Sequence, residues 1–349
     1  MKNQYLNKIF IIVLFLTMFS QSHAIRSYNH QSTFGVWTEW TSFVEIPEKL
    51  VHVKKSQARI HLAIKKDELN DNNFNDLISL LQKLEREKID YWLWPLLTKS
   101  EGYWPNQWNM DVYTQYVTEL IQRLEKQNLH PKGISIDLEP PPEKLEKYLE
   151  LVQKFKFKQL REYANSGIDE NLFEKATLEL TSFNRFLKSK NITTHIVTTP
   201  FILDDIPNHH LKKIFGIPNI DDNFDYISFM IYRSEFERIV GVMNSRIIYE
   251  YGLKAKAKFG DKAGLDLGVV GNIEFPHKLD GYSEPHRLWE DIAAAKASGI
   301  NQMQIYCLDG IDSDEWIQDV PAKKPSYSVK NSLIQTMMKL LLKQLNSHN

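Results

Sequence analysis

Eight short runs of strand type recur along the chain, and helical segments lie between nearly all of them. The runs cover residues 33–40, 58–64, 90–97, 133–139, 194–201, 226–232, 264–270 and 303–308. Five intervening segments place apolar residues three and four apart, as amphipathic helices do, at 74–88, 110–127, 143–161, 171–190 and 284–298. Strands that alternate with helices form parallel sheets, and eight such units predict an α/β fold, the (β/α)8 TIM barrel.

The N-terminus has the layout of a secretory signal peptide. Lys2 and Lys8 come before an apolar run at 9–19, and Ser22 and Ala24 form a small-x-small cleavage signal. We therefore predict a signal peptide over 1–24 and one barrel domain over 25–349, in a secreted or periplasmic protein. The apolar run is shorter than the roughly 20 residues that span a bilayer, and no later stretch is long and apolar enough, so we expect no membrane span in the mature chain. Helical spacing at 326–345 predicts a last helix that closes the barrel.

Charge and cysteine usage narrow the class of partner. The chain has 43 Lys and Arg against 44 Asp and Glu, a net charge of −1, and the two signs are interspersed. Nucleic acids require a clustered positive field, so we expect no nucleic-acid partner. Cys307 is the only cysteine, and we expect it on the outward face of the eighth strand as a buried small hydrophobe. His61 and His195 are isolated in the sequence and no spacing resembles a zinc site, so we expect core or rim histidines and no metal. We also expect no organic cofactor and a monomer.

Polar and apolar residues alternate along the fourth run, so that one face holds Ser135, Asp137 and Glu139. The isoleucine and leucine face must pack against helices, so the two carboxyl groups point into the barrel, where burial is costly. The same parity places inside Trp37, Glu39, His61, Ser228, Met230, Tyr232, Asp266, Gln304 and Tyr306. A barrel filled for stability alone would contain mainly Val, Ile and Leu. We interpret this polar and aromatic lining as functional.

The carboxyl ends of barrel strands form the active site of TIM-barrel enzymes, and Glu139, Tyr232 and Asp309 fall there. Glu139 is therefore a candidate general acid. The loop after the third strand adds Tyr103, Trp104 and Trp108, whose flat apolar faces suit sugar rings. We predict that they contribute a platform for a carbohydrate substrate.

Three strings resemble the motifs of glycoside hydrolase family 18, the chitinase and endo-N-acetylglucosaminidase group. They read Lys132-Gly-Ile-Ser-Ile-Asp-Leu-Glu139, Met230-Ile-Tyr-Arg233 and Tyr306-Cys-Leu-Asp309. The family patterns are Asp-Gly-x-Asp-x-Asp-x-Glu on strand four, Met-x-Tyr-Asp or Asn on strand six, and an end near Trp-Ser-Leu-Asp on strand eight.

The resemblance implies that Glu139 protonates the glycosidic oxygen, that Asp137 orients the substrate's acetamido group and that Tyr232 hydrogen-bonds to that group. Tyr306 would form the base of the subsite. The remaining substrate-binding predictions are Trp37, Met230, Asp309, Trp104 and Arg233. The substrate's own carbonyl would act as the nucleophile, in a retaining, substrate-assisted mechanism. Chitin, bacterial wall polymer and host N-glycan all fit as the N-acetylglucosamine-containing glycan.

The chain also departs from the family. Lys132 and Ser135 replace two aspartates, Arg233 follows the tyrosine, Tyr306 replaces a tryptophan, and strand three lacks Ser-x-Gly-Gly. Two alternatives therefore stay open. One is a retaining glycosidase in which Glu139 is the acid/base and Glu274 the nucleophile, with carboxyl groups about 5 to 5.5 Å apart. The other is a carbohydrate-binding barrel without turnover.

Overall fold

The computed structural model describes residues 32–39, 47–154, 156–205, 210–220, 223–240, 243–273 and 279–326. The chain divides into two compact units, Met1–Gln31 and Ser32–Asn349, and all described residues belong to the second. The predicted signal peptide at 1–24, Glu274 and nearly all of the predicted helix at 326–345 lie outside the described residues. Those features stay predictions.

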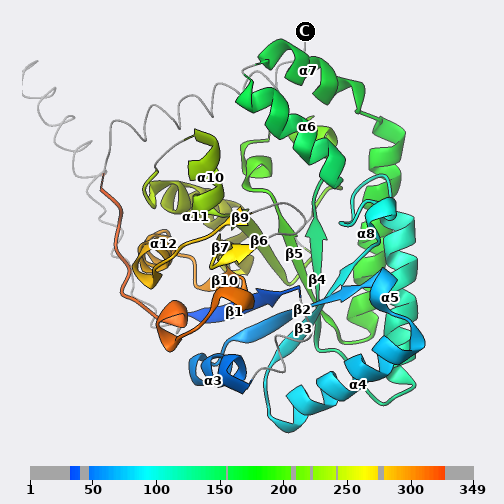
Figure 1. Cartoon of the computed structure of the whole chain (residues 1–349). Coiled ribbons are helices and arrows are strands. Elements are labelled where there is room, and N and C mark those ends of the chain that lie inside the picture. Colours follow the sequence, from blue (N-terminus) through cyan, green and yellow to red (C-terminus); the bar gives the residue numbers. More distant parts are fainter. Residues whose placement is uncertain are drawn as a thin grey trace, which may run out of the picture. The chain divides into compact units, whose positions relative to one another are not determined.

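Eight parallel strands close into a barrel, which confirms the predicted fold class (Figure 1). β1 pairs with both β2 and β10, so the sheet has no edge. The strands, each overlapping one predicted run, are β1 (Thr33–Thr38), β2 (Arg59–Lys65), β3 (Tyr91–Leu96), β4 (Gly133–Leu138), β5 (Thr193–Thr198), β6 (Tyr226–Ile231), β7 (Ala263–Gly268) and β10 (Gln302–Tyr306). A small antiparallel pair, β8 (Asn272–Ile273) and β9 (Leu279–Asp280), follows β7.

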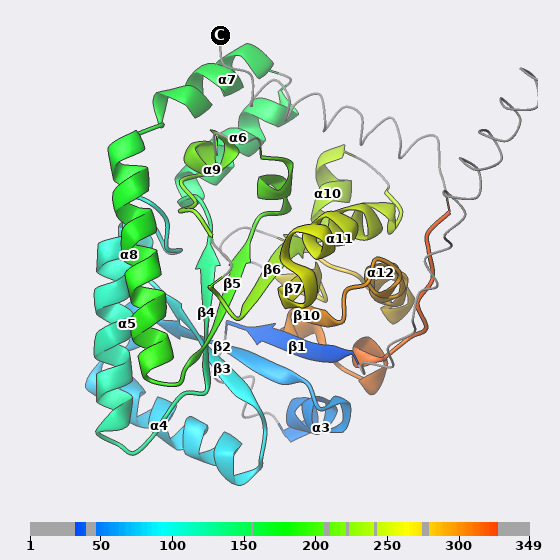
Figure 2. The ribbon, with the colours of Figure 1, turned by 180° about the vertical axis from the view of Figure 1, so that it is seen from behind.

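Helices surround the barrel and bury their apolar faces against the outward faces of the strands. They are α3 (Pro47–Ser56), α4 (Asp71–Arg86), α5 (Met110–Glu125), α8 (Glu170–Ser189), α11 (Arg246–Phe259) and α12 (Pro285–Ala297). In α4, for example, Asn70 caps the N-terminus and leucines and a phenylalanine at helical spacing are buried. Figures 1 and 2 show α4, α5 and α8 on one side of the barrel and α11 and α12 on the other.

The segment predicted as one helix at 143–161 is two helices, α6 (Pro142–Gln153) and α7 (Phe157–Ser166). The break between them lets α7 contact both α6 and the short helix α9 (His210–Phe215), which a continuous helix would pass by. α10 (Arg233–Val240) follows β6. Both α6 and α10 contribute residues to the cavity described below.

A network of hydrogen bonds crosses the barrel interior. The hydroxyl of Ser135 lies 2.8 Å from Nδ1 of His61 and 3.2 Å from Nδ1 of His195. Nε2 of His195 lies 2.8 Å from the hydroxyl of Ser228, which in turn donates to Asp266. These residues come from β2, β4, β5, β6 and β7 and are buried, which confirms the inward parity predicted for His61, Ser135, Ser228 and Asp266.

The positions of His61 and His195 in the sequence suggested that they are isolated. In the structure they are neighbours, because their ring centroids lie 5.2 Å apart. Burial lowers the pKa of His195 to about 3 and that of His61 well below its usual range, so both rings are neutral. Gly35 makes room for His61, since a Cβ there would stand 2.5 Å from its Nε2. The barrel centre is therefore polar but holds neutral imidazoles rather than cations.

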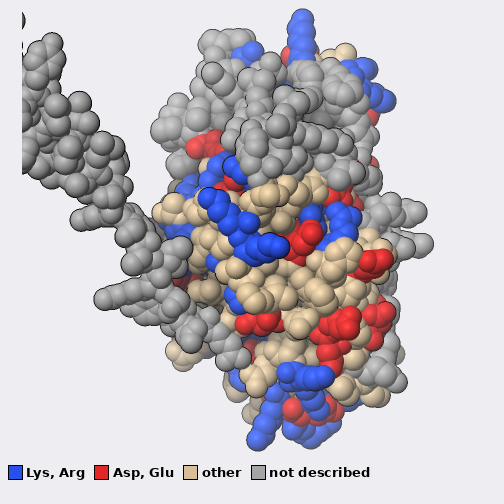
Figure 3. All heavy atoms as spheres, turned by 90° about the vertical axis from the view of Figure 1, so that its left-hand side faces the viewer, with Lys and Arg blue, Asp and Glu red and all other residues tan. Residues whose placement is uncertain are grey.

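On the face shown in Figure 3, basic and acidic side chains of the described residues are interspersed. Within the described part of the chain, no helix is both long and apolar enough to cross a membrane.

Candidate active site

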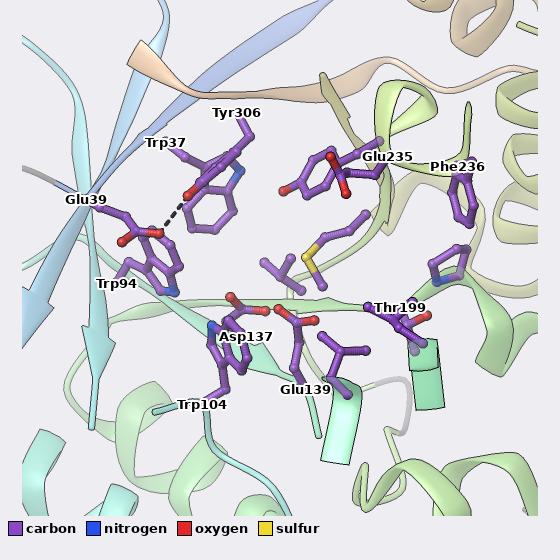
Figure 4. A pocket seen from close by; sticks show the side chains of 16 residues that line it. Trp37, Glu39, Trp94, Trp104, Asp137, Glu139, Thr199, Glu235, Phe236 and Tyr306 are labelled. Carbon is purple, nitrogen blue, oxygen red and sulfur yellow. Dashed lines mark hydrogen bonds between the residues drawn. The ribbon is translucent and has the colours of Figure 1, made fainter. Parts of the chain in front are cut away.

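A cavity of about 180 Å³ opens at the carboxyl ends of the strands, where the sequence placed the active site. Residues from β1, β3, β4, β6 and β10, from the loop after β3 and from α6 and α10 line it (Figure 4). Of the predicted site residues, the structure brings together Trp37, Trp104, Asp137, Glu139, Met230, Tyr232 and Tyr306. Asp309 and Arg233 do not line the cavity.

Asp137, on β4, and Glu139, one residue beyond its end at Leu138, both reach the cavity. Their Cα atoms are about 6 to 7 Å apart by strand rise. Burial raises the pKa of Glu139 to about 8. Burial also raises the pKa of Asp137 well above its usual range, and Glu139, Asp266 and Glu39 add to this by charge repulsion. At neutral pH the pair therefore retains a proton that it can donate.

The Oδ1 atom of Asp137 is buried and accepts no hydrogen bond of ordinary geometry from the described residues. The indole of Trp94 partly offsets the rise in the pKa of Asp137. A buried carboxyl oxygen with unused lone pairs, facing a cavity, is suited to accept a hydrogen bond from a bound molecule.

Tyr232 and Tyr306 form an aromatic wall beside the two carboxyl groups. Their ring centroids lie 5.5 Å apart with planes 29° from parallel. Trp37 on β1 is the register partner of Tyr306 on β10. Its indole N–H donates to Asp266 Oδ1 at 3.0 Å. Burial raises the pKa of Asp266 to about 7, and this N–H bond opposes that rise. Trp37 therefore joins the cavity wall to the polar interior of the barrel.

Glu39, one residue beyond β1, also lines the cavity, although its inward parity alone did not mark it as a site residue. Only 5% of its surface is exposed, and burial raises its pKa. The Tyr306 hydroxyl donates to its Oε1 at 2.6 Å, and the Tyr103 hydroxyl donates to its Oε2 at 3.1 Å. Strand parity placed Glu39 inside the barrel, and the two tyrosine hydroxyls show that it is part of the site.

Other lining residues gave no usable signal in the sequence. They come from the start of α10, from α6 and from the turn after β5, and they are Glu235, Phe236, Leu145, Leu149, Thr199 and Pro200. Whether a helix turns such residues toward the barrel mouth depends on how it docks, which periodicity within the helix does not reveal.

Arg233 is turned away from the cavity and buried, with 2% exposure of its side chain. It forms ion pairs with Asp291 at 3.0 Å and with Glu290 at 3.1 Å, and it donates to the Tyr282 hydroxyl at 3.1 Å. Because these acceptors occupy its guanidinium, the structure places Arg233 in a link between α10 and α12 and not at the predicted substrate position.

Two residues that follow β10 also differ from the prediction. Asp309 accepts a hydrogen bond from the Thr38 hydroxyl at 3.3 Å and lies outside the cavity lining. Cys307 is buried, as predicted, but it packs with the interior aromatic cluster and not on the outward face. β10 ends at Tyr306, so the two-residue period of a strand no longer fixes the direction of either side chain.

The three aromatic residues of the loop after β3 have separate positions. Trp104 lines the cavity. Tyr103 is buried and binds Glu39. Trp108 is partly exposed outside the cavity lining, with the Lys144 ammonium 4.0 Å from its ring centroid. A platform of all three residues is therefore not formed, and Trp104 alone faces the cavity.

No protein-family model matches the chain, and no curated protein matches it in sequence. Among solved structures, it is similar to a family 1 β-glucosidase from Thermotoga maritima, with a TM-score of 0.51 at 10% identity over 80% of this chain and 89% of that one. The same enzyme in complex with castanospermine gives a TM-score of 0.50 at 11% identity with the same coverage. The spore cortex-lytic enzyme SleL of Bacillus megaterium gives 0.47 at 11% identity, over 82% of this chain and 72% of that chain. At 10% identity, the likeness to the β-glucosidase shows a shared barrel fold.

Proposed function

We propose that the chain is a glycoside hydrolase that cleaves an N-acetylglucosamine-containing glycan with retention of configuration. The observation on which the proposal rests is the convergence of Asp137, Glu139 and Tyr232 on one open cavity with aromatic walls. The fold hosts many chemistries, so the proposal depends on this cavity and not on the likeness to known glycosidases.

Glu139 supplies the acid. In its protonated form it donates its proton to the glycosidic oxygen while the bond from that oxygen to the anomeric carbon breaks. The acetamido carbonyl oxygen of the same sugar attacks the anomeric carbon from the other side, which gives a cyclic oxazolinium intermediate. A water then attacks that carbon while the bond from the carbon to the acetamido oxygen breaks and restores the acetamido group, and the Glu139 carboxylate takes up the proton of the water. Two inversions give net retention.

Asp137 and Tyr232 are suited to hold the acetamido group for this attack. The unused Oδ1 of Asp137 accepts the amide N–H, which turns the carbonyl toward the anomeric carbon and stabilises the positive charge that develops there. Tyr232, one residue beyond β6, lines the same cavity and provides a hydroxyl that can donate to the carbonyl oxygen.

The departure at Ser135 is compatible with this proposal. A carboxylate at that position would lie between His61 and His195, whose rings are neutral, and would add a further negative charge below Asp137. The Ser135 hydroxyl satisfies both rings without any charge.

The test of the mechanism compares two substrates that differ only in the acyl group. An aryl glycoside of N-acetylglucosamine oligomers should be hydrolysed with a first product of unchanged anomeric configuration, measured by NMR. The N-trifluoroacetyl analogue should react far more slowly, because fluorine weakens the carbonyl nucleophile. Equal rates for the two substrates would instead support a protein nucleophile such as Glu274, and binding without any product would support the binding-only alternative.

The pH profile of kcat/KM follows from the protonation state of Glu139. The active form is protonated, and burial places its pKa near 8. We therefore expect kcat/KM to hold through neutral pH and to fall above pH about 8, approaching tenfold per pH unit. Circular dichroism over the same range checks that the protein stays folded. A decline that begins near pH 5 would mean that Glu139 is an ordinary exposed carboxylate and not the acid.

A further inference from the structure

Among the described residues, the cavity lining has several carboxyl groups and no cation. The carboxyl-bearing residues are Glu39, Asp137, Glu139 and Glu235, and none of the described lining residues is Lys, Arg or His. In the view of Figure 4, Glu39 lies on the left, Glu235 on the right, and Asp137 and Glu139 between them. A carboxylate, sulfate or phosphate on a sugar would find no cation to pair with among these residues, whereas neutral hydroxyls, amides and ammonium groups can donate to the carboxyl oxygens, so the lining favours a neutral or cationic glycan.

The left end of the cavity combines a buried carboxyl group with aromatic rings. Glu39 is buried there, and each of its oxygens accepts one tyrosine hydroxyl, which leaves further lone pairs. The nearest cation is Lys65, whose Nζ lies 4.0 Å from Oε2 of Glu39 and 3.6 Å from Glu68. Lys65 lies outside the cavity lining, so it does not fill the space in front of Glu39.

Aromatic rings surround the same end. Trp37, Trp94, Trp104 and Tyr306 line the cavity beside Glu39 and belong to one packed cluster. Trp37 and Trp94 meet edge to face with ring centroids 4.9 Å apart. The faces of indole and phenol rings attract ammonium groups, and a carboxylate among such rings strengthens that attraction in a partly desolvated site.

We propose that the Glu39 end of the cavity is a subsite for an amino sugar with a free ammonium group. The substrate is then a partly de-N-acetylated polymer, with an N-acetylated sugar at Asp137 and Glu139 and a de-N-acetylated sugar next to it. This inference rests on the proposed function, since it places the second sugar relative to the cleavage site.

The experiment is isothermal titration calorimetry of N-acetylglucosamine tetramers on the Glu139→Gln protein, which holds substrate without turnover. One set of tetramers has a single free amine at each of the four positions, and the reference tetramer is fully acetylated. We expect one of the mono-amine tetramers to bind at least about tenfold more tightly than the reference at low salt. The advantage should shrink as salt is raised, because it is electrostatic.

Adding Glu39→Gln should abolish this preference while the acetylated tetramer still binds, since glutamine keeps the shape and the acceptor for a tyrosine hydroxyl. Glu68→Gln is the matched control, because Glu68 faces the same Lys65 but is 56% exposed and outside the lining. The control should leave the preference unchanged.

Equal binding of acetylated and mono-amine tetramers, or a preference that survives Glu39→Gln or high salt, would overturn the amine subsite and leave the proposed function standing. The salt series on the protein with Glu39 intact decides the matter even if the double variant fails to fold. Failure of every tetramer to bind would overturn both.

Discussion

Replacing Glu139 by glutamine is expected to lower the rate of hydrolysis by roughly 10²- to 10⁴-fold, the contribution typical of a general acid. Glutamine keeps the size of the side chain and its hydrogen-bonding reach but has no proton to give. Glycan binding should therefore persist, and calorimetry beside a reducing-end assay of the same preparation separates the two properties.

Glu146→Gln on α6 is the control, because Glu146 is exposed and absent from the cavity lining. It should leave the rate within a factor of two. Asp137→Asn should also slow hydrolysis, since the acetamido group loses its orienting anion, whereas Glu274→Gln should have little effect. An essential Glu274 together with a dispensable Asp137 would favour the two-glutamate alternative.

Replacing Arg233 by methionine is expected to lower the free energy of unfolding by about 3 to 5 kcal/mol, because it leaves Asp291 buried without its partner. Asp291 has no exposed surface, and burial raises its pKa to about 6 even with Arg233 beside it. Urea unfolding followed by tryptophan fluorescence measures the loss.

The loss should depend on pH in a defined direction. A folded-state pKa raised above the unfolded value means that ionising Asp291 costs stability as pH rises through about 6. Without Arg233 that cost grows, so the loss should be larger at pH 8 than at pH 5. Arg123→Met, which removes a pair with the exposed Asp71, should cost about 1 kcal/mol or less at either pH. If the Arg233→Met protein keeps its stability but loses glycan affinity, the prediction that Arg233 binds the substrate would be supported instead.

Strand parity predicted the barrel and most of the cavity lining from the sequence alone. On β1, β4 and β6 the two-residue period correctly turned Trp37, Asp137 and Met230 inward. It still held one residue beyond a strand end for Glu39, Glu139 and Tyr232, but it was less reliable farther on and after β10. β6 ends at Ile231 and β10 at Tyr306, and the misplaced Arg233, Cys307 and Asp309 all follow those ends.

Contacts between residues far apart in the sequence were the other feature that the sequence did not predict. His61 and His195 look unrelated in the sequence, yet Ser135 joins them in the barrel centre. Glu39 was visible as an inward residue, but its importance depends on two tyrosine hydroxyls that arrive from the loop after β3 and from β10. Pairings of this kind are set by the closed sheet, and a single sequence contains no direct signal for them.

The hydrogen-bond network through the barrel interior affects how the protein unfolds. It joins β2 through Ser135 to β5 and β6, and Asp266 joins β7 back to Trp37 on β1. Opening one half of the barrel alone would leave several of these buried polar groups without partners, each at a cost of about 1 to 3 kcal/mol. Partial opening is thereby penalised, so amide protons of β1 and β2 should exchange with solvent through the same cooperative event as those of β5 to β7.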